Sequence, residues 1–194
     1  MQRILVVSIL FLFTFNYLSS ENNFTITKIT ENNIQLKLHI DEYSFSDINI
    51  EGQLYQNIAL PKIDFLRISE ESAPQLPFLS KVIGLPPNGN ISAKIISANY
   101  KLIENKNIAY NPTYIERNDK LITSFEIPAS YQKRSYFPGK IIESEVVGYV
   151  GDRNLGVVRI FPFQFNPGEN KLKIYTDLTI TISLTGSKKR NVFP

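Results

Sequence analysis

Apolar and polar residues alternate strictly in two segments of this chain, and that pattern excludes most folds. Over residues 178–184 the sequence is Leu-Thr-Ile-Thr-Ile-Ser-Leu, and over residues 34–40 it is Ile-Gln-Leu-Lys-Leu-His-Ile. Successive side chains of a strand point to opposite faces, so a period of two places every apolar residue on one face. Both segments are therefore predicted to be strands with one buried face.

Shorter β-like segments fill most of the chain between these two. Residues 91–102 and 141–150 are rich in β-branched and aromatic residues, which favour strands. Clusters of Pro, Gly, Asn and Asp at residues 85–90, 151–154 and 166–170 predict turns. No segment combines helical periodicity with capping residues. We therefore predict an all-β fold, an antiparallel, jelly-roll-like β-sandwich.

Three stretches are less regular. Residues 45–60 are β-like, and Gly52 is predicted to form a bulge within them. Residues 104–120 and 128–139 are polar and rich in turn formers, so both are predicted to be long loops, which often carry function in compact domains. Tyrosine is enriched at binding surfaces, and four tyrosines of these loops are interface candidates: Tyr110, Tyr114, Tyr131 and Tyr136.

The N-terminus has the order of a secretory signal peptide. A positive start that includes Arg3 precedes an apolar run over residues 4–18, and small residues follow up to Ser20. The run is shorter than the ~20 residues that a spanning helix needs, so we expect cleavage near Ser20 and no stable membrane span afterwards. The predicted organisation is a signal-peptide helix over residues 1–20, a β-sandwich over residues 21–186 and a basic tail over residues 187–194. The product is expected to be exported, either to the periplasm or to the cell surface and medium.

The composition excludes most catalytic chemistry. The chain has no cysteine and a single histidine, His39, among its 194 residues. It therefore lacks a thiol nucleophile, thiolate metal ligands and the material for more than one histidine-dependent site. The net charge is +3, and Lys and Arg are scattered among Asp and Glu, so no basic block indicates nucleic acid. We predict a non-catalytic protein with no cofactor, no metal site and no nucleic-acid partner.

Two groups of short motifs, taken together, resemble one known family. Residues 73–78 (Ala-Pro-Gln-Leu-Pro-Phe) and 82–86 (Val-Ile-Gly-Leu-Pro) resemble a proline-punctuated segment of gingipain-type propeptides. The C-terminal half of that family is matched by Phe137-Pro138, Val147-Gly148, Leu155 to Val158, and Phe161 to Pro167. The chain departs from the family pattern at Phe137, Leu155 and Phe165, where the family has Tyr, Arg and Tyr. The resemblance spans nearly the whole mature chain.

The resemblance implies a β-sandwich that precedes a caspase-like cysteine protease, assists its folding and keeps it latent. Latency is implied to come from a loop placed in the active-site cleft, with a basic side chain filling an Arg- or Lys-selective pocket. The candidates for that side chain are Arg117, Lys120, Lys133 and Arg134. Candidates for processing past the last strand are Lys188, Lys189 and Arg190, because cleavage concentrates in exposed tails. The implied partner is a gingipain-type cysteine protease domain, in cis in the family and possible in trans here.

Other interpretations of the sequence stay open. An exported adhesive or carbohydrate-binding sandwich would present coplanar exposed tyrosines on one face, and it would have no projecting basic loop. An enzyme is disfavoured because the sequence offers no nucleophile beside a base. No protease segment is present in the 194 residues, and a stand-alone domain, a truncated product and a fragment of a split gene are all compatible with that.

Overall fold

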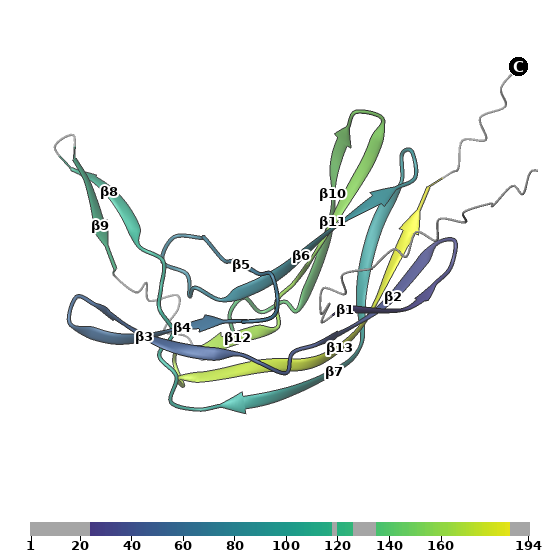
Figure 1. The fold of residues 1–194 in the computed structure, drawn as a ribbon. Coiled ribbons are helices and arrows are strands. Elements are labelled where there is room, and N and C mark those ends of the chain that lie inside the picture. Colours follow the sequence, from purple (N-terminus) through teal and green to yellow (C-terminus); the bar gives the residue numbers. More distant parts are fainter. Residues whose placement is uncertain (1–23, 118–119, 126–134, 187–194) are drawn as a thin grey trace, which may run out of the picture.

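The computed structural model of the chain describes residues 24–117, 120–125 and 135–186. These residues form strands and their connections, without a helix (Figure 1). None of the described segments is therefore a helix long and apolar enough to cross a membrane. The expected signal-peptide helix, its cleavage at Ser20 and the tail after residue 186 lie outside the described residues.

The described part of the chain contains thirteen strands. In chain order they are β1 (Phe24–Ile29), β2 (Asn33–His39), β3 (Ser44–Ile50), β4 (Gln53–Ala59), β5 (Leu66–Arg67), β6 (Pro77–Leu85), β7 (Asn90–Ile103), β8 (Thr113–Arg117), β9 (Lys120–Ser124), β10 (Ile142–Val150), β11 (Arg153–Ile160), β12 (Phe163–Asn166) and β13 (Lys171–Thr185). All the named strands that pair do so in antiparallel fashion. The prediction of an all-β, antiparallel fold is confirmed.

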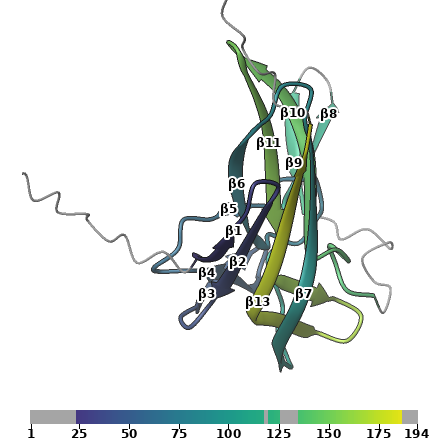
Figure 2. The same ribbon diagram turned by 90° about the vertical axis from the view of Figure 1, so that its right-hand side faces the viewer.

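The strands form two large sheets that face each other, with two separate hairpins. One sheet has the order β1-β2-β13-β12, with β7 on the other side of β13, and the second has the order β10-β11-β6-β5. In Figure 1 the β7–β13 layer lies below the β6–β10–β11 layer, and Figure 2 shows the same two layers from the side. Hairpins β3–β4 and β8–β9 complete the fold.

Strand β13 organises the larger sheet. It pairs with β7 along nearly its whole length, whereas its opposite side pairs first with β12 and then with β2. Alternate residues from Leu172 to Ile182 face the core, and the five aliphatic members of that row are at most 1% exposed: Leu172, Ile174, Leu178, Ile180 and Ile182. The predicted alternation over residues 178–184 is thus half of a longer buried row. This row packs with the inward side chains of the second sheet, such as Leu79 and Ile160, in one hydrophobic core.

Two expectations from the sequence are wrong. Gly52 is not in a bulge: Glu51 and Gly52 have φ of 51° and 83° and form the two-residue turn of the β3–β4 hairpin, in which both positions need positive φ. Residues 104–120 are not one long loop, because they contain β8 and the start of β9. Both errors arise from short polar hairpin strands, whose side chains carry little hydrophobic periodicity.

The turn between β6 and β7 is held by a buried side chain of the neighbouring strand β11. Asn154 of β11 is 3% exposed, and its Nδ2 donates hydrogen bonds to the carbonyls of Pro86 (3.1 Å) and Gly89 (3.0 Å). A Cβ on Gly89 would lie 2.6 Å from the carbonyl oxygen of Thr185. Close backbone approach therefore requires glycine at position 89.

Candidate interaction surface

The β8–β9 hairpin extends away from the two sheets (Figure 1). Its register pairs Thr113 with Ser124 at the base and Arg117 with Lys120 at the described end. Two of the four basic candidates from the sequence are therefore brought together at the far end of one projecting hairpin. Lys120 is exposed, and Tyr114 on β8 is 52% exposed.

The segment that leads into the hairpin is held firmly by the domain. The Asn111 side chain donates hydrogen bonds from Nδ2 to the carbonyls of Ile68 and Glu70, both at 2.8 Å. The Asn111 amide also donates to the Ala73 carbonyl at 2.9 Å. The hydroxyls of Ser72 and Thr113 are hydrogen-bonded to each other at the first residue of β8. These bonds connect the base of the hairpin to the proline-containing segment before β6, so the hairpin starts from a fixed point.

Tyr110 corrects the prediction that this region is an exposed loop. It is 4% exposed, and its ring meets that of Tyr55 edge to face with centroids 6.3 Å apart. The backbone around it is paired as well, since Gln75 donates from its amide to the Ala109 carbonyl and from its side chain to the Tyr110 carbonyl. Tyr110 is part of the anchor under the hairpin and is not available at the surface.

Tyr136 is half-buried, and it packs against a lysine. The Lys173 Nζ lies 4.3 Å from the centre of its ring and 4.7 Å from the ring of Tyr100. Burial, and then the nearby Glu169 carboxylate, raises the pKa of the Tyr136 hydroxyl, because both oppose the phenolate. The remaining sequence candidates lie outside the described residues: Tyr131, Lys133, Arg134, Ser20, Lys188, Lys189 and Arg190.

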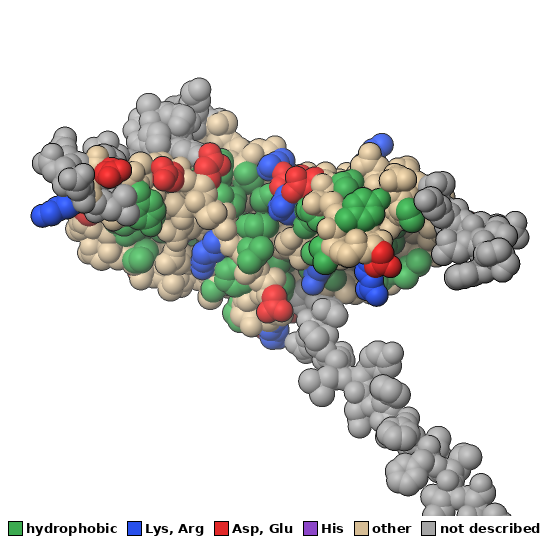
Figure 3. Space-filling view, turned by 90° about the horizontal axis from the view of Figure 1, so that it is seen from above, with side chains coloured by type: hydrophobic (Ala, Val, Ile, Leu, Met, Phe, Trp, Pro, Cys, Tyr) green, Lys and Arg blue, Asp and Glu red, His purple; other side chains and the backbone are tan. Residues whose placement is uncertain are grey.

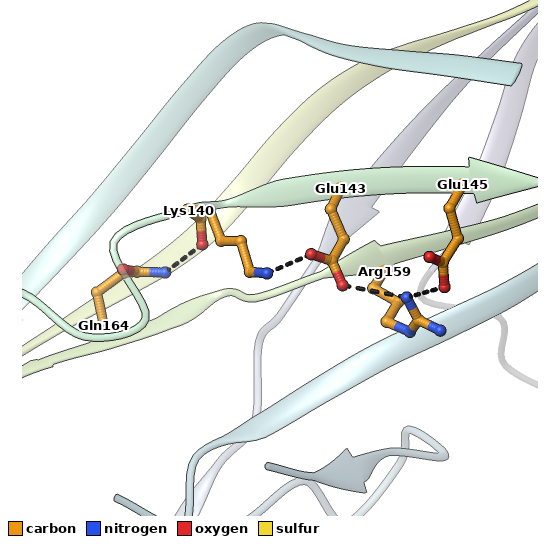
Figure 4. Close-up of polar contacts among 5 residues, drawn as sticks. All are labelled: Lys140, Glu143, Glu145, Arg159 and Gln164. Carbon is orange, nitrogen blue, oxygen red and sulfur yellow. Dashed lines mark hydrogen bonds and ion pairs between the residues drawn. The ribbon is translucent and has the colours of Figure 1, made fainter. Parts of the chain in front are cut away.

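A polar network that the sequence did not indicate fastens the second sheet (Figure 4). Arg159 of β11 contacts Glu143 at 3.1 Å and Glu145 at 2.6 Å, and Lys140 contacts Glu143. Burial alone would raise the pKa of the Glu143 carboxyl, but hydrogen bonds from Lys140 and Arg159 outweigh it and lower that pKa. The pairing of β10 with β11 brings these residues opposite one another.

The network continues to the segment before β10. Gln164 is 3% exposed. Its side-chain nitrogen donates hydrogen bonds to the carbonyls of Lys140 and Phe161, and its side-chain oxygen accepts one from the Gly139 backbone amide. Figure 4 shows Gln164 and Glu143 on either side of Lys140. The spacing of Lys140 and Glu143, three residues apart, did not predict this network, because their partner Arg159 comes from the next strand.

His39 has a carboxylate partner that the sequence did not reveal. It lies on β2 beside Asp177 of β13, and the Nδ1 and Oδ1 atoms are 2.6 Å apart. The hydrogen bond with His39 is the largest influence on the Asp177 carboxyl and lowers its pKa. Both side chains are at least half exposed, which distinguishes the pair from a buried catalytic dyad. Among the described residues no cluster of His, Asp and Glu is suited to hold a metal ion.

The side of the molecule that carries the free ends of the hairpins is chemically mixed. Seen from above in Figure 3, acidic, basic and hydrophobic side chains are interspersed along it, without a continuous patch of one charge sign. Exposed apolar side chains near the β10–β11 turn include Val147 and Tyr149, which are 54% and 55% exposed. Such a mixture suits contact with a protein surface, where apolar and charged groups are interleaved.

Two solved structures have the same fold. One, concerned with the zymogenic latency of gingipain K from Porphyromonas gingivalis, matches with a TM-score of 0.71 at 15% identity and covers 84% of this chain and 92% of that chain. The other, a complex of the pro- and mature domains of Porphyromonas gingivalis RgpB, matches with a TM-score of 0.70 at 22% identity and covers 89% and 90%. At these identities the likeness establishes the fold.

Sequence relatives agree with the structural match. Gingipain R1 of Porphyromonas gingivalis is 30% identical over 130 residues, which cover 66% of this chain and 13% of gingipain R1. Gingipain R2 of the same organism (strain ATCC 33277) is 25% identical over 163 residues, which cover 81% of this chain and 21% of that protein. The chain thus spans only a small part of the length of these curated relatives. The family model Propeptide_C25 matches residues 17–194, and the chain therefore belongs to this propeptide family.

Proposed function

We propose that this domain binds the catalytic domain of a gingipain-type cysteine protease, assists its folding and keeps it latent by placing the β8–β9 hairpin in the active-site cleft. Family membership supports a propeptide role. The structural relatives support the type of partner, since one concerns zymogenic latency and the other is a complex of pro- and mature domains. The partner acts in cis where both are one chain and in trans where they are separate.

The observation that carries the proposal is a projecting hairpin with two basic residues at its far end and an immobilised base. Arg117 and Lys120 are cross-strand partners at that end. The Asn111 hydrogen bonds and the buried Tyr110 fix where the hairpin leaves the domain. A hairpin whose base is already fixed loses less conformational freedom on docking than a free loop does, so more of its contact energy is expressed as affinity.

A basic side chain at the end of the hairpin fits an Arg- or Lys-selective specificity pocket. The guanidinium of Arg117 would pair with a carboxylate in such a pocket in a bidentate manner, whereas the Lys120 ammonium would act as a point charge. Lys133 and Arg134 are the second pair of candidates, and the same experiment tests them. We further propose that the complex forms after export, in the periplasm or at the cell surface, in agreement with the leader-like N-terminus and the family.

The test is inhibition of a purified gingipain-type catalytic domain by the purified propeptide domain. Arg117→Ala and Lys120→Ala are expected to weaken inhibition. Substitution of the residue that occupies the pocket is expected to raise the inhibition constant tenfold or more, because truncation of a central interface residue costs roughly 2 kcal/mol of binding free energy. The single variants Lys133→Ala and Arg134→Ala form the second arm of the experiment. Arg153→Ala is the matched control, because Arg153 is an exposed basic residue at the turn of another hairpin, β10–β11.

The control is expected to inhibit like the unchanged domain. A folded domain that fails to inhibit at micromolar concentration would contradict the proposed partner. Equal inhibition by the domain and by all four alanine variants would instead retain the partner and reject the basic residue as the contact that enters the cleft.

A further inference from the structure

The outward face of the five-stranded sheet carries ordered rows of polar side chains. One row crosses four strands and consists of Ser97 on β7, Thr179 on β13, Lys37 on β2 and Thr25 on β1. The next row, two residues along β13, contains Lys94, Thr181, Gln35 and Lys28. The opposite side of the same strands is the hydrophobic core, so this polarity belongs to the outward face alone.

Two adjacent open grooves follow these rows. The first, of about 430 Å³, is lined by the Ser97–Thr179–Lys37–Thr25 row together with His39, Asp177, Asn99 and two leucines, Leu38 and Leu178. The second, of about 250 Å³, is lined by Lys28, Thr30, Asn33, Gln35 and Thr181. The rows are two residues apart on β13, which corresponds to about 7 Å along a strand. A ligand with a repeating unit can therefore use the same kinds of donor and acceptor in both grooves.

The charge on this face is positive. Lys28, Lys37 and Lys94 are exposed, and none of them takes part in an ion pair between described residues. Asp177 is the only carboxylate among the described residues that line either groove, and His39 is hydrogen-bonded to it. Unpaired lysines on a flat, hydroxyl-rich surface create a field that attracts anions, and their ammonium groups form charge-assisted hydrogen bonds to acidic oxygens.

We propose that this face, defined by the two rows and their grooves, binds an anionic polysaccharide. Thr, Ser, Asn and Gln side chains both donate and accept hydrogen bonds, as sugar hydroxyls require, and the lysines meet the acidic substituents of the chain. The residues that line the second groove are all polar, which suits a hydroxyl-rich ligand better than the apolar core of a protein interface. Tyr100 is 55% exposed and packs against Tyr175. This pair offers an aromatic surface at the end of the first groove that Asn99 and Asp177 line.

This site is separate from the hairpin proposed to enter the protease. In Figure 1 the β1–β2 strands and the part of β13 beside them lie at the right, whereas the β8–β9 hairpin extends at the upper left. From the sequence, a sugar-binding face was expected to present coplanar exposed tyrosines. The structure has instead an edge-to-face Tyr100–Tyr175 pair, with an interplanar angle of 64°, beside the lysine rows.

The test is direct binding of the chain to polygalacturonate, dextran sulfate, neutral dextran and single-stranded DNA, measured at low and high salt. The expected result is binding to both acidic polysaccharides, weakening as salt screens the lysines, with no binding to dextran and at least tenfold weaker binding to DNA. Binding to only one acidic polysaccharide identifies whether carboxylate or sulfate is recognised and also supports the proposal. Equal binding to DNA, or binding to none of the polymers, overturns it.

The variants separate this face from general positive charge. Lys28→Glu, Lys37→Glu and Lys94→Glu combined are expected to weaken binding to the acidic polysaccharide about tenfold or more, because three charged contacts are reversed. A control with the same net change carries Lys81→Glu, Lys120→Glu and Arg153→Glu, all exposed and off this face. Equal losses in both triple variants overturn the proposal. Since the face variant is expected to retain protease inhibition, failure here is distinguishable from failure of the proposed function.

Discussion

Single residues connect segments that are distant in the sequence, and Asn154 is the clearest case. Its side-chain amide holds the turn between β6 and β7 through the carbonyls of Pro86 and Gly89, just beyond the point where Asn154 pairs with Leu85 of β6. The Lys140–Glu143–Arg159 network does the same for the segment before β10. Each of these residues acts through its position between chain segments, and their loss has measurable consequences for stability.

Asn154→Ala is expected to lower the free energy of unfolding by about 1–2 kcal/mol, because the buried Gly89 carbonyl loses its side-chain donor, while the Pro86 carbonyl keeps its bond from the Gly89 amide. Chemical denaturation monitored by circular dichroism measures this. The neighbouring exposed Arg153→Ala is the control and is expected to change stability by less than about 0.5 kcal/mol. Equal stability of the two variants would show that the turn is held by other contacts.

Glu143 gives the domain an acid-sensitive component of stability. Its carboxyl has a pKa below the ordinary value in the folded state, so the network stabilises the fold above the pH at which the unfolded carboxyl titrates. That contribution begins to fall at about pH 5, where unfolded glutamate starts to titrate, and it is lost as the pH falls through the lower, folded-state pKa.

Glu143→Gln is expected to remove about 1 kcal/mol of stability at neutral pH and to flatten the loss below about pH 5. Unfolding measured at a series of pH values tests the expectation. Glu51→Gln, which changes an exposed turn residue, is the control. A variant whose stability falls with acid as steeply as that of the unchanged domain would exclude Glu143 as the titrating group.

The strands themselves were the most predictable level of the structure. Period-two alternation identified β2 and the second half of β13, because a strand with one buried face must show it. The β-like character predicted for residues 45–60 is confirmed by β3 and β4, but the hairpin strands β8 and β9 were predicted as loop, because their polar sequence shows little alternation. Cross-strand partners such as His39 with Asp177, and the buried position of Tyr110, depend on sheet order, which a single sequence does not specify.

Strand β13 offers a matched pair of adjacent substitutions. Ile180 is fully buried and Thr179 faces outward, so Ile180→Ala is expected to destabilise the domain by about 2–4 kcal/mol and Thr179→Ala by less than about 1 kcal/mol. Thermal and denaturant unfolding of the two variants measure the difference. Similar losses for both would contradict the assignment of even-numbered residues of β13 to the core.

The β6–β7 turn provides a second element-scale comparison. Gly89→Ala places a methyl group 2.6 Å from the Thr185 carbonyl oxygen, whereas Gly84→Ala meets nothing within 4 Å. The first substitution is expected to lower the unfolding midpoint by several degrees, as a loss of about 1–2 kcal/mol would, and the second to change it little. If Gly89→Ala unfolds like Gly84→Ala, the turn relaxes easily and is not a fixed link between β7 and β13.

At the scale of the whole molecule, the described residues form a sandwich, and we propose that the domain acts by contact with a protease. Membership in a propeptide family confirms that the chain is not an enzyme. The composition already excluded thiol chemistry, and the ordered motifs at residues 73–86 and 137–167 predicted the family, because proline-punctuated segments survive as short recognisable patterns. The position of the hairpin that we propose to enter the protease was not predictable, since it required knowing that Thr113–Arg117 pairs with Lys120–Ser124 and projects from the sheets.

The most direct measurement of the central claim is backbone amide exchange of the domain alone and in a mixture with a gingipain-type catalytic domain. We predict slow exchange in β13, β2 and β11 in both samples, and new protection on binding concentrated in residues 113–124. Rapid exchange throughout the free domain, or binding that protects other strands and leaves this hairpin unchanged, would contradict the account of a rigid sandwich that acts through its projecting hairpin.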